Sequence, residues 1–267
     1  MTRPKKSLGQ NFLRDEAVID RIVESLDLRD DETVVEIGAG EGALTKKLVQ
    51  SNANVVAIEI DSELVPKLRN QFARENKFSV IEADVLAVDF EVEIQSANPH
   101  SAFRNPHSIK LVGNLPYYIS TAILQKLSAE RQVFSNIVLM LQREVAKRVT
   151  ALPGNSERGF LTVITEAAFE VTNLFDVPPT AFFPEPKVWS SVVMLTPKPK
   201  SAGDEPRFKE LISAAFAQKR KTITNNLKHI RGDVATVLEK TNIDSRRRAE
   251  TLTLDEWFAL YKSFAKT

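Results

Sequence analysis

The sequence predicts an α/β fold in which a seven-stranded sheet, with helices between its strands, precedes a small all-helical C-terminal domain. Between residues 33 and 196, short runs of β-branched residues alternate with helix-like stretches, a pattern typical of a wound sheet rather than of successive hairpins. After residue 206 only amphipathic helical patterns remain. A length of 267 residues, with 43% hydrophobic and 27% charged residues, is sufficient for one large core and a small appendage.

The elements of the first part alternate between strand and helix. Seven segments are expected to be strands: 33–37, 55–60, 78–81, 109–113, 137–141, 168–174 and 188–195. Helices are expected at 43–51, 62–75, 121–129 and 160–166, the second of them beginning at Ser62 as its N-cap. Between residues 87 and 110 the sequence is irregular and contains two Asn-Pro pairs, so we expect a long exposed connection and assign it no role.

A linker rich in proline separates two predicted domains. The linker contains four residues that break regular secondary structure: Pro197, Pro199, Gly203 and Pro206. Helices are expected after it at 208–227, 234–240 and 254–264. We therefore place the domains at residues 1–199 and 200–267. Residues 201–267 carry 13 Lys or Arg against 9 Asp or Glu, while the whole chain has a net charge of +1. Taken alone, so small a basic excess is more often a solvated helix face than a binding surface.

Composition argues against several kinds of site. The chain has no cysteine, which excludes thiolate metal sites, disulfides and cysteine nucleophiles, and which fits a reducing compartment. Its histidines, His100, His107 and His229, have no partner at the spacing of metal ligands, so no metal centre is expected. The first residues lack the apolar core of a secretory signal, and no apolar run approaches the ~18 residues that span a bilayer. We expect a soluble cytoplasmic protein.

A glycine-rich turn after the first predicted strand indicates a nucleoside cofactor. Gly38, Gly40 and Gly42 have the spacing Gly-x-Gly-x-Gly, which favours S-adenosylmethionine over the dinucleotides bound by Gly-x-Gly-x-x-Gly. Glu59 ends the next strand, where a carboxylate can accept hydrogen bonds from both ribose hydroxyls, and Asp84 follows the third, where a carboxylate can accept one from an adenine amino group. Because parallel strands end at one edge of a sheet, the sequence predicts a cofactor site there.

The sequence Asn114-Leu115-Pro116-Tyr117 at the end of the fourth strand indicates methyl transfer to a planar exocyclic amine. The lone pair of such an amine is delocalised into its ring, so hydrogen-bond acceptors must draw the nitrogen towards tetrahedral geometry. The amide oxygen of Asn114 and the backbone carbonyl of Leu115 can each accept one N–H group, and Pro116 stiffens the corner. No strong base is required, because the methylated nitrogen can lose its proton to water.

Aromatic residues near this corner are candidates for holding a flat target base. Tyr117 offers one face, and Phe182, in the proline-rich segment 177–184, offers the other. We interpret Phe183 as a core aromatic and Tyr118 as packing against the helix that follows it.

With these motifs, the chain resembles the rRNA adenine N6,N6-dimethyltransferases of the KsgA type over nearly its whole length. The run from Lys6 to Leu13 is similar to the N-terminal Gly-Gln-Asn-Phe-Leu signature of that family, and residues 182–191 are similar to its Phe-x-Pro-x-Pro-Lys-Val-x-Ser block. Ala39 stands where the family often has proline, and Tyr118 where it often has asparagine. Both departures lie beside the chemistry rather than in it.

The resemblance implies a Rossmann-like methyltransferase sheet, S-adenosylmethionine as cofactor, and dimethylation of two adjacent adenosines near the 3′ end of small-subunit (16S) rRNA during ribosome assembly. The family positions that contact the cofactor correspond here to Asn11, Leu13, Gly38, Glu59, Asp84 and Asn114. The target-adenine positions correspond to Asn114, Leu115, Tyr117 and Phe182. The expected partners are small-subunit rRNA and the pre-ribosomal small subunit, without membrane or metal, and the chain is expected to act as a monomer.

An RNA partner accords with the basic charge of the C-terminal part. Lys219, Arg220 and Lys221, and also the run from Arg246 to Arg248, can neutralise phosphates, which positions an RNA without specifying its sequence. Unpaired adenosines are also the easiest to splay into a pocket.

Three alternatives remain open at this point. The erythromycin-resistance type of rRNA methyltransferase shares the sheet and the Asn-x-Pro-Tyr corner but modifies large-subunit rRNA, and segments 177–182 and 216–222 resemble the ribosome-assembly group more closely. A non-catalytic RNA-binding assembly or transcription factor could use the same fold, although the cofactor positions are intact. A protein-glutamine or DNA-adenine methyltransferase would share the corner but not the N-terminal signature or the helical tail.

Overall fold

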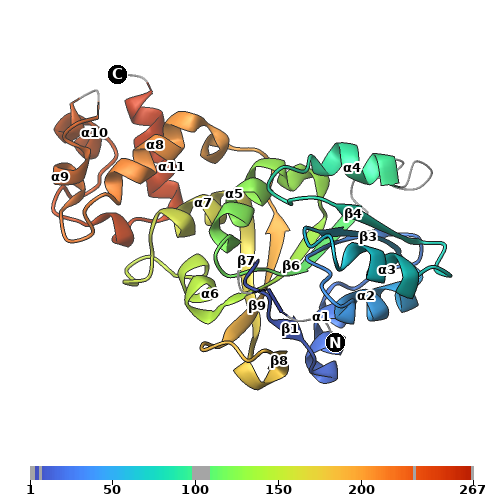
Figure 1. Ribbon diagram of the computed structural model, residues 1–267. Coiled ribbons are helices and arrows are strands. Elements are labelled where there is room, and N and C mark those ends of the chain that lie inside the picture. Colours follow the sequence, from blue (N-terminus) through green and yellow to red (C-terminus); the bar gives the residue numbers. More distant parts are fainter. Residues whose placement is uncertain (1–3, 6–7, 98–108, 231–232, 266–267) are drawn as a thin grey trace. The chain divides into compact units, whose positions relative to one another are not determined.

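The computed structural model describes residues 4–5, 8–97, 109–230 and 233–265 (Figure 1). Lys6 and Ser7 of the N-terminal signature lie outside the described residues, as do His100, His107 and the segment between them. Contacts within the chain define two compact units, one comprising Met1–Ala146 and Thr172–Pro197, the other Lys147–Val171 and Lys198–Thr267. We refer to them as the sheet unit and the helical unit.

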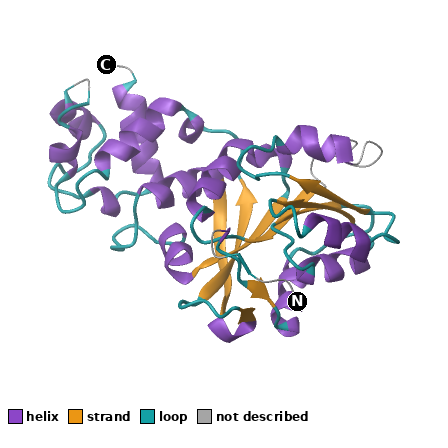
Figure 2. Ribbon diagram, viewed as in Figure 1, coloured by secondary structure: helices purple, strands orange, loops and turns teal. Residues whose placement is uncertain are grey.

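A seven-stranded sheet forms the framework of the sheet unit, with the strand order β4-β3-β2-β5-β6-β9-β7. Figure 2 draws the strands in orange and the helices in purple. Its strands are β2 (Thr33–Ile37), β3 (Asn54–Glu59), β4 (Phe78–Glu82), β5 (Ile109–Asn114), β6 (Asn136–Gln142), β7 (Phe169–Val177) and β9 (Ser190–Pro197). Neighbouring strands from β4 to β6 pair in parallel, and β9 runs antiparallel to β6. Every residue of β2 and β3 is buried, as expected for parallel strands covered on both faces. The predicted α/β class and its seven strands are confirmed.

Two further strands, β1 (Phe12–Leu13) and β8 (Phe182–Phe183), pair antiparallel to form a small separate ladder. Phe12 lies opposite Phe183, and Leu13 lies opposite Phe182. The sequence did not predict this ladder, because two residues are too few to show an alternating pattern. It ties the N-terminal segment to the loop that precedes β9.

Helices connect the strands of the sheet unit. They are α1 (Glu16–Ser25), α2 (Ala43–Leu48) continued by the 3-10 turn η2 (Val49–Ser51), α3 (Val65–Gln71), α4 (Phe90–Ala97), α5 (Ser120–Glu130) followed by η4 (Arg131–Val133), and η5 (Pro179–Ala181). A further helix, α6 (Arg143–Val149), begins in the sheet unit and ends in the helical unit. The predicted helix at 62–75 is too long, and Ser62 is not its N-cap. The Asp61 carboxylate instead accepts the N–H of Glu63, which forms a turn ahead of the helix. The connection at 87–110 is not irregular throughout, since it contains α4.

The core of the sheet unit joins α1 and α2 to the sheet. Val18, Ile19 and Ile22 of α1 are buried in one cluster with Val34 of β2 and Val55 of β3. Asp15 caps α1 by accepting the N–H groups of residues 17 and 18 at 3.0 and 3.2 Å. The helix was not predicted, although an aspartate N-cap before residues with helical apolar spacing is a recognisable signal.

The helical unit contains α7 (Phe160–Ala168), α8 (Pro206–Ala215), α9 (Ile223–Leu227), α10 (Val234–Lys240) and α11 (Leu254–Phe264), with the 3-10 turns η6 (Ala202–Asp204) and η7 (Ala249–Thr251). The single helix expected at 208–227 is two helices, because the chain turns at Gln218–Lys221 and Thr222 caps the second. The predicted boundary at 199/200 also differs from the observed division, since Lys147–Val171 lies with the C-terminal helices. Trp257 and Phe208, both fully buried, are central to this unit's core.

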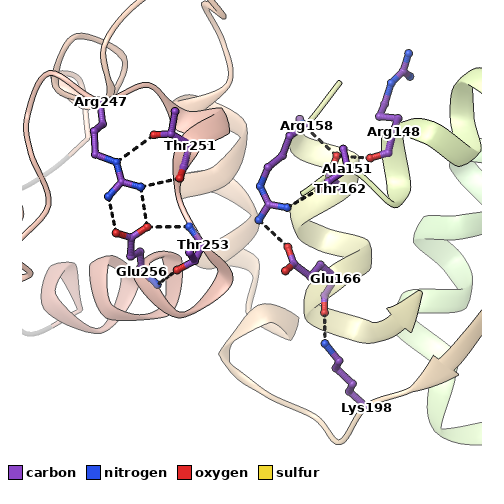
Figure 3. Close-up of polar contacts among 11 residues, drawn as sticks. Arg148, Ala151, Arg158, Thr162, Glu166, Lys198, Arg247, Thr251, Thr253 and Glu256 are labelled. Carbon is purple, nitrogen blue, oxygen red and sulfur yellow. Dashed lines mark hydrogen bonds and ion pairs between the residues drawn. The ribbon is translucent and has the colours of Figure 1, made fainter. Parts of the chain in front are cut away.

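Two arginines organise polar contacts within the helical unit (Figure 3). Arg158, which is 1% exposed, donates to the Glu166 carboxylate at 2.6 Å and to the Ala151 carbonyl at 2.9 Å. Arg247 donates to both carboxylate oxygens of Glu256 at 2.5 and 2.9 Å, and Glu256 in turn accepts the N–H of Thr253 to close the capping box of α11. Both guanidinium groups therefore stabilise the fold of this unit.

Candidate active site

A cavity of about 190 Å³ opens at the carboxyl edge of the sheet, within the sheet unit. Its walls come from the ends of β2, β3, β4 and β5 and from residues 8–12, which we term the N-terminal strap. The sequence-predicted residues that line it are Asn11, Gly38, Gly40, Glu59, Asp84, Asn114, Leu115 and Tyr117. The structure thus brings the glycine turn and the Asn-Leu-Pro-Tyr corner, which are more than 70 residues apart in sequence, to one site.

The N-terminal strap is anchored at both of its ends. Asp61, 2% exposed, accepts hydrogen bonds from the Lys5 ammonium at 2.7 Å and the Gln10 amide at 2.8 Å. Burial by itself would raise the pKa of Asp61, but the bonds from Lys5 and Gln10 bring it below its ordinary value. At the other end, β1 is paired with β8. Asp61 was missed in the sequence because its partners are more than 50 residues away.

The glycine turn and Glu59 form one side of the cavity. Gly40 has φ +59° and a Cβ there would lie 3.1 Å from the ring of Phe12, so this position requires glycine. The Gly40 N–H donates to Glu59 at 2.9 Å, and the N–H of Asp61 donates to the other carboxylate oxygen at 2.9 Å. Burial raises the pKa of Glu59, which is 5% exposed, while these two backbone bonds oppose the rise. A held carboxylate facing a backbone cradle fits the nucleoside part of S-adenosylmethionine.

Asp84 and two apolar side chains form the wall that follows β3 and β4. One carboxylate oxygen of Asp84 accepts the N–H of Leu86 at 2.9 Å, which fixes the carboxylate at the rim of the cavity. Ile60 and Leu86 line the same cavity with 48% and 37% of their surface exposed. Apolar faces beside an acceptor suit a purine ring with an amino group.

Asn114 ends β5 with its side chain held in one orientation. Its amide NH₂ donates to the backbone carbonyl of Asn11 at 3.0 Å, which identifies the nitrogen because a carbonyl can only accept. None of the described residues donates a hydrogen bond to its amide oxygen, so that oxygen is the acceptor the side chain offers. A Cβ on Gly38 would lie 3.8 Å from the Asn114 carbonyl, so the amide corner and the glycine turn are adjacent.

Tyr117 is fixed by a residue that was not predicted as part of the site. Its hydroxyl shares a 2.8 Å hydrogen bond with Ser190, the fully buried first residue of β9. Burial raises the pKa of Tyr117, with the bond to Ser190 acting against it, so the phenol stays protonated. Tyr118, expected to pack against α5, is instead 61% exposed and lines the cavity beside Gly9.

Leu13 and Phe182 do not line the cavity. They face each other in the β1–β8 ladder and are 4% and 3% exposed, packed in the core of the sheet unit. Phe183, interpreted from sequence as a core aromatic, is instead 47% exposed, with the Arg14 guanidinium 5.0 Å from its ring centroid. The interpretation was wrong because successive residues of a strand point to opposite faces, and Phe182 occupies the buried one.

The predicted phosphate-binding residues fall into two groups in the helical unit. Lys219, Arg220 and Lys221 are all exposed in the turn between α8 and α9. Arg247, in contrast, is paired with Glu256 (Figure 3). Arg246 is paired with Asp244 at 2.9 Å. The arginine run therefore supplies less free charge than its sequence suggested.

Two further features of the described residues bear on other kinds of function. Among the described residues, no group of three or more His, Cys, Asp or Glu side chains is arranged to hold a metal ion. In the same part of the chain, no helix is both long enough and apolar enough to cross a membrane.

Comparison with known sequences gives consistent results. The family model for ribosomal RNA adenine dimethylases matches residues 1–266. The ribosomal RNA small subunit methyltransferase A of Saccharophagus degradans is 41% identical over 261 residues, which cover 97% of this chain and 93% of that protein. The protein of the same name from Geobacter metallireducens is 39% identical over 269 residues, covering 98% and 95%.

Solved structures agree with these sequence matches. A dimethyladenosine transferase from Plasmodium falciparum superposes with a TM-score of 0.81 and 26% identity, covering 96% of this chain and 98% of the other. The 23S rRNA methyltransferase ErmE superposes with a TM-score of 0.70 and 28% identity, covering 96% and 100%. The Rossmann-like methyltransferase fold predicted from sequence is thereby confirmed. With a family model that spans nearly every residue and relatives about 40% identical along the whole length, the chain belongs to the ribosomal RNA adenine dimethylase family.

Proposed function

We propose that this chain dimethylates the N6 amines of two adjacent adenosines near the 3′ end of small-subunit (16S) rRNA, using S-adenosylmethionine, during ribosome assembly. Membership of the family makes the chain an S-adenosylmethionine-dependent rRNA adenine dimethyltransferase. The choice of the small subunit is supported by relatives 41% and 39% identical that carry the name small subunit methyltransferase A.

The orientation of the Asn114 amide is the observation that carries the chemistry. Because its NH₂ group is bonded to the Asn11 carbonyl at 3.0 Å, its oxygen is the atom available to a ligand's N–H. The Leu115 N–H likewise donates to the Met140 carbonyl, at 3.3 Å. The backbone group that Leu115 can offer to a ligand is therefore its own carbonyl oxygen. We assign these two oxygens to the two N–H groups of the adenine amine.

Two fixed acceptors suffice for this reaction. S-adenosylmethionine, when bound, supplies an electrophilic methyl group. The Asn114 and Leu115 oxygens draw the amine hydrogens out of the ring plane, which concentrates the nitrogen lone pair on the side facing the glycine turn. Preorganisation is provided by the strand end and by the Asn11 bond, so the acceptors need no rearrangement. The proton released by the alkylated nitrogen passes to water.

We assign the cofactor to the Asn11, Gly38, Gly40, Glu59 and Asp84 side of the cavity. Glu59, held by two backbone N–H groups, retains a second lone pair on each oxygen with which it can accept the ribose hydroxyls. We retain Leu13 as a cofactor residue through its support of the strap, and Phe182 as the second face of the base clamp. For Phe182 this role requires the β1–β8 ladder to open, because the ring is now in the core.

The remaining assignments concern the whole protein. We propose that residues 1–199 carry the catalytic machinery and that residues 200–267 position RNA, through Lys219, Arg220 and Lys221. We further propose a monomer that acts in the cytoplasm on the pre-ribosomal small subunit without a metal ion. The large-subunit alternative is not favoured, because relatives 41% and 39% identical along the whole length carry the name small subunit methyltransferase A.

Methyl transfer to purified ribosomal subunits tests the proposal directly. The chain is incubated with labelled S-adenosylmethionine and unmethylated small subunits, with large subunits in parallel, and modified adenosines are mapped. We expect label at adjacent adenosines near the 3′ end of the small-subunit rRNA. Label confined to the large subunit would establish the alternative instead, and RNA binding without transfer would indicate a non-catalytic factor.

A further inference from the structure

Trp189 and Arg143 lie at the edge of the sheet that carries the target-base corner, immediately before β9 and immediately after β6. The β5–β6 register pairs Asn114 with Met140, and the β6–β9 register pairs Gln142 with Ser190. Arg143 and Trp189 continue that second ladder by one step, with the Arg143 N–H donating to the Trp189 carbonyl at 2.9 Å. The pair therefore stands at the same carboxyl edge as Asn114.

A hydrogen bond links this pair to the base site itself. Ser190, the residue directly after Trp189, shares the 2.8 Å bond with the Tyr117 hydroxyl. The backbone that carries the indole thus also sets the position of Tyr117, which lines the cavity. Because successive residues of a strand point to opposite faces, the indole projects from the face opposite to the Ser190 hydroxyl. A base stacked on Trp189 would therefore belong to a neighbouring nucleotide that crosses the same edge of the sheet.

The indole has the properties of a stacking surface. It is 42% exposed, whereas the other tryptophan of the chain, Trp257, is fully buried. The Arg143 guanidinium lies 5.5 Å from its ring centroid. Among the described residues, no carboxylate forms an ion pair with Arg143, so its charge remains available to a phosphate or a base. An aromatic face joined to an uncompensated arginine is a combination that binds unpaired nucleotides.

The neighbouring aromatic–arginine pair is less suited to this task. Arg14 lies near the ring of Phe183, but its guanidinium is paired with Glu41 at 3.0 Å, which offsets its charge. Lys187, two residues before Trp189, is exposed and adds a cation that can contact the RNA backbone. Arg143, which has no such ion-pair partner among the described residues, is thus the more available cation of the two pairs, which favours an anionic partner at Trp189.

We propose that Trp189 and Arg143 form a stacking platform for the unpaired nucleotide next to the target adenosine. The inference rests on the proposed function, because it takes the cavity beside Tyr117 as the adenine site. It adds a specific role: the platform holds the neighbouring base while the target adenosine enters the cavity. Substrate affinity, rather than donor affinity, should depend on it.

Substitution of Trp189 tests the platform. Trp189→Ala should raise the KM for unmethylated small subunits about tenfold, the loss expected for one stacked base, while S-adenosylmethionine affinity stays at the wild-type value. Trp189→Leu is the matched control, since it keeps apolar surface but lacks a flat face, and it should behave like the alanine variant. Trp189→Phe should recover most of the affinity.

Tryptophan fluorescence provides a readout that is independent of turnover. A short single-stranded RNA with two adjacent adenosines should quench the emission of Trp189, whereas buried Trp257 contributes an unchanged background. The RNA-dependent quenching should disappear in Trp189→Phe. Arg143→Gln should weaken RNA binding and reduce its salt dependence.

The outcomes separate this inference from the proposed function. If wild-type protein methylates small subunits while Trp189→Ala has an unchanged KM and RNA causes no quenching, the platform is rejected and the function stands. If wild-type protein transfers no methyl group, the function fails, whereas RNA-dependent quenching of Trp189 would still support the stacking surface. Quenching by ribosomal protein but not by RNA would overturn the inference in favour of a protein contact.

Discussion

At the scale of single residues, Asn114 has the most direct chemical consequence. Asn114→Ala should lower kcat by about 10²–10³-fold, the usual cost of removing one preorganised hydrogen-bonding group. Binding of S-adenosylmethionine, measured by calorimetric titration, should weaken far less than kcat falls, because Gly38, Gly40 and Glu59 remain. The matched control is Asn136→Ala, at the first residue of the neighbouring strand β6 and outside the cavity, which should turn over normally. Unchanged turnover in Asn114→Ala would remove the amine-holding role.

Glu59 connects the glycine turn to the proposed ribose site. Glu59→Gln should weaken S-adenosylmethionine binding by about 1–3 kcal/mol, because an amide cannot accept from both backbone N–H groups and both ribose hydroxyls. The control is Glu82→Gln, which is opposite Glu59 in the β3–β4 register but exposed and outside the cavity. Equal dissociation constants for Glu59→Gln and the wild type would contradict the ribose assignment.

Glu36 makes stability depend on pH. It is 1% exposed, and burial raises its pKa from 4.5 to about 7, with the Thr45 hydroxyl opposing the rise and the charge of Glu59 adding to it. Below pH 4.5 both the folded and the unfolded chain hold this proton. As pH rises from there to about 7, the unfolded chain ionises first, so the free energy of unfolding falls by on the order of 3 kcal/mol.

Glu36→Gln should abolish this dependence. The difference in free energy of unfolding between the variant and the wild type should favour the variant more at about pH 8 than at about pH 5. This change should be up to about 3 kcal/mol, as measured by urea unfolding followed by circular dichroism. The control Glu82→Gln, an exposed glutamate of the same sheet, should leave the pH dependence in place. Parallel pH profiles for wild type and Glu36→Gln would show that the buried carboxyl does not titrate differently on folding.

At the scale of elements, the anchoring of the N-terminal strap should control donor affinity. Asp61→Asn removes the ion pair with Lys5 and one acceptor of Gln10, so residues 8–12 should lose their fixed position over the cavity. We expect S-adenosylmethionine affinity to fall about three- to tenfold, since exposed parts of the anchor are screened by solvent. Amide hydrogen exchange in the strap should accelerate at the same time.

A control for this element is available on the sheet unit. Asp31 pairs with Lys77 at 2.8 Å but lies outside the cavity, so Asp31→Asn should leave both donor affinity and strap exchange unchanged. Faster amide exchange in Asp61→Asn without any loss of S-adenosylmethionine affinity would show that anchoring of the strap does not control cofactor binding.

The elements that sequence reasoning found are those with a repeated local pattern. Strands such as β2 and β3 are short runs rich in β-branched residues, which is typical of strands buried on both faces, so they could be predicted from the sequence. The β1–β8 ladder has no such signal, because its two halves are 170 residues apart and each has only two residues. The break between α8 and α9 depends on Thr222 acting as an N-cap. It was not predicted, because the apolar residues on either side have the spacing of one continuous helix.

The site shows the same distinction. Gly38, Glu59, Asp84 and Asn114 were predictable because each follows a recognisable strand, and parallel strand ends must converge. Asp61 and Ser190 were not, because their roles depend on side chains far away in sequence, Lys5 and Gln10 for one and Tyr117 for the other. Burial of Phe182 rather than Phe183 follows from the ladder register, which the sequence does not specify.

At the scale of the whole molecule, charge in the helical unit should contribute to RNA binding. Replacing Lys219, Arg220 and Lys221 with Gln should weaken binding to small-subunit rRNA and lower the salt slope, log Kd against log salt concentration, by up to about 2. Arg246→Gln is the control, because its guanidinium is already neutralised by Asp244 at 2.9 Å. An unchanged slope in the triple variant would exclude this turn from the RNA contact.

The anchored N-terminal strap has a practical consequence for recombinant work. Lys5 holds Asp61 and the very next described residues line the donor cavity, so an affinity tag fused ahead of the chain would be tethered within a few residues of the methyl donor. Such a tag can crowd the pocket or compete for the Asp61 carboxylate. Protein purified with a tag on the opposite terminus should therefore bind S-adenosylmethionine more tightly than its N-terminally tagged counterpart, and protease removal of the leading tag should abolish the difference.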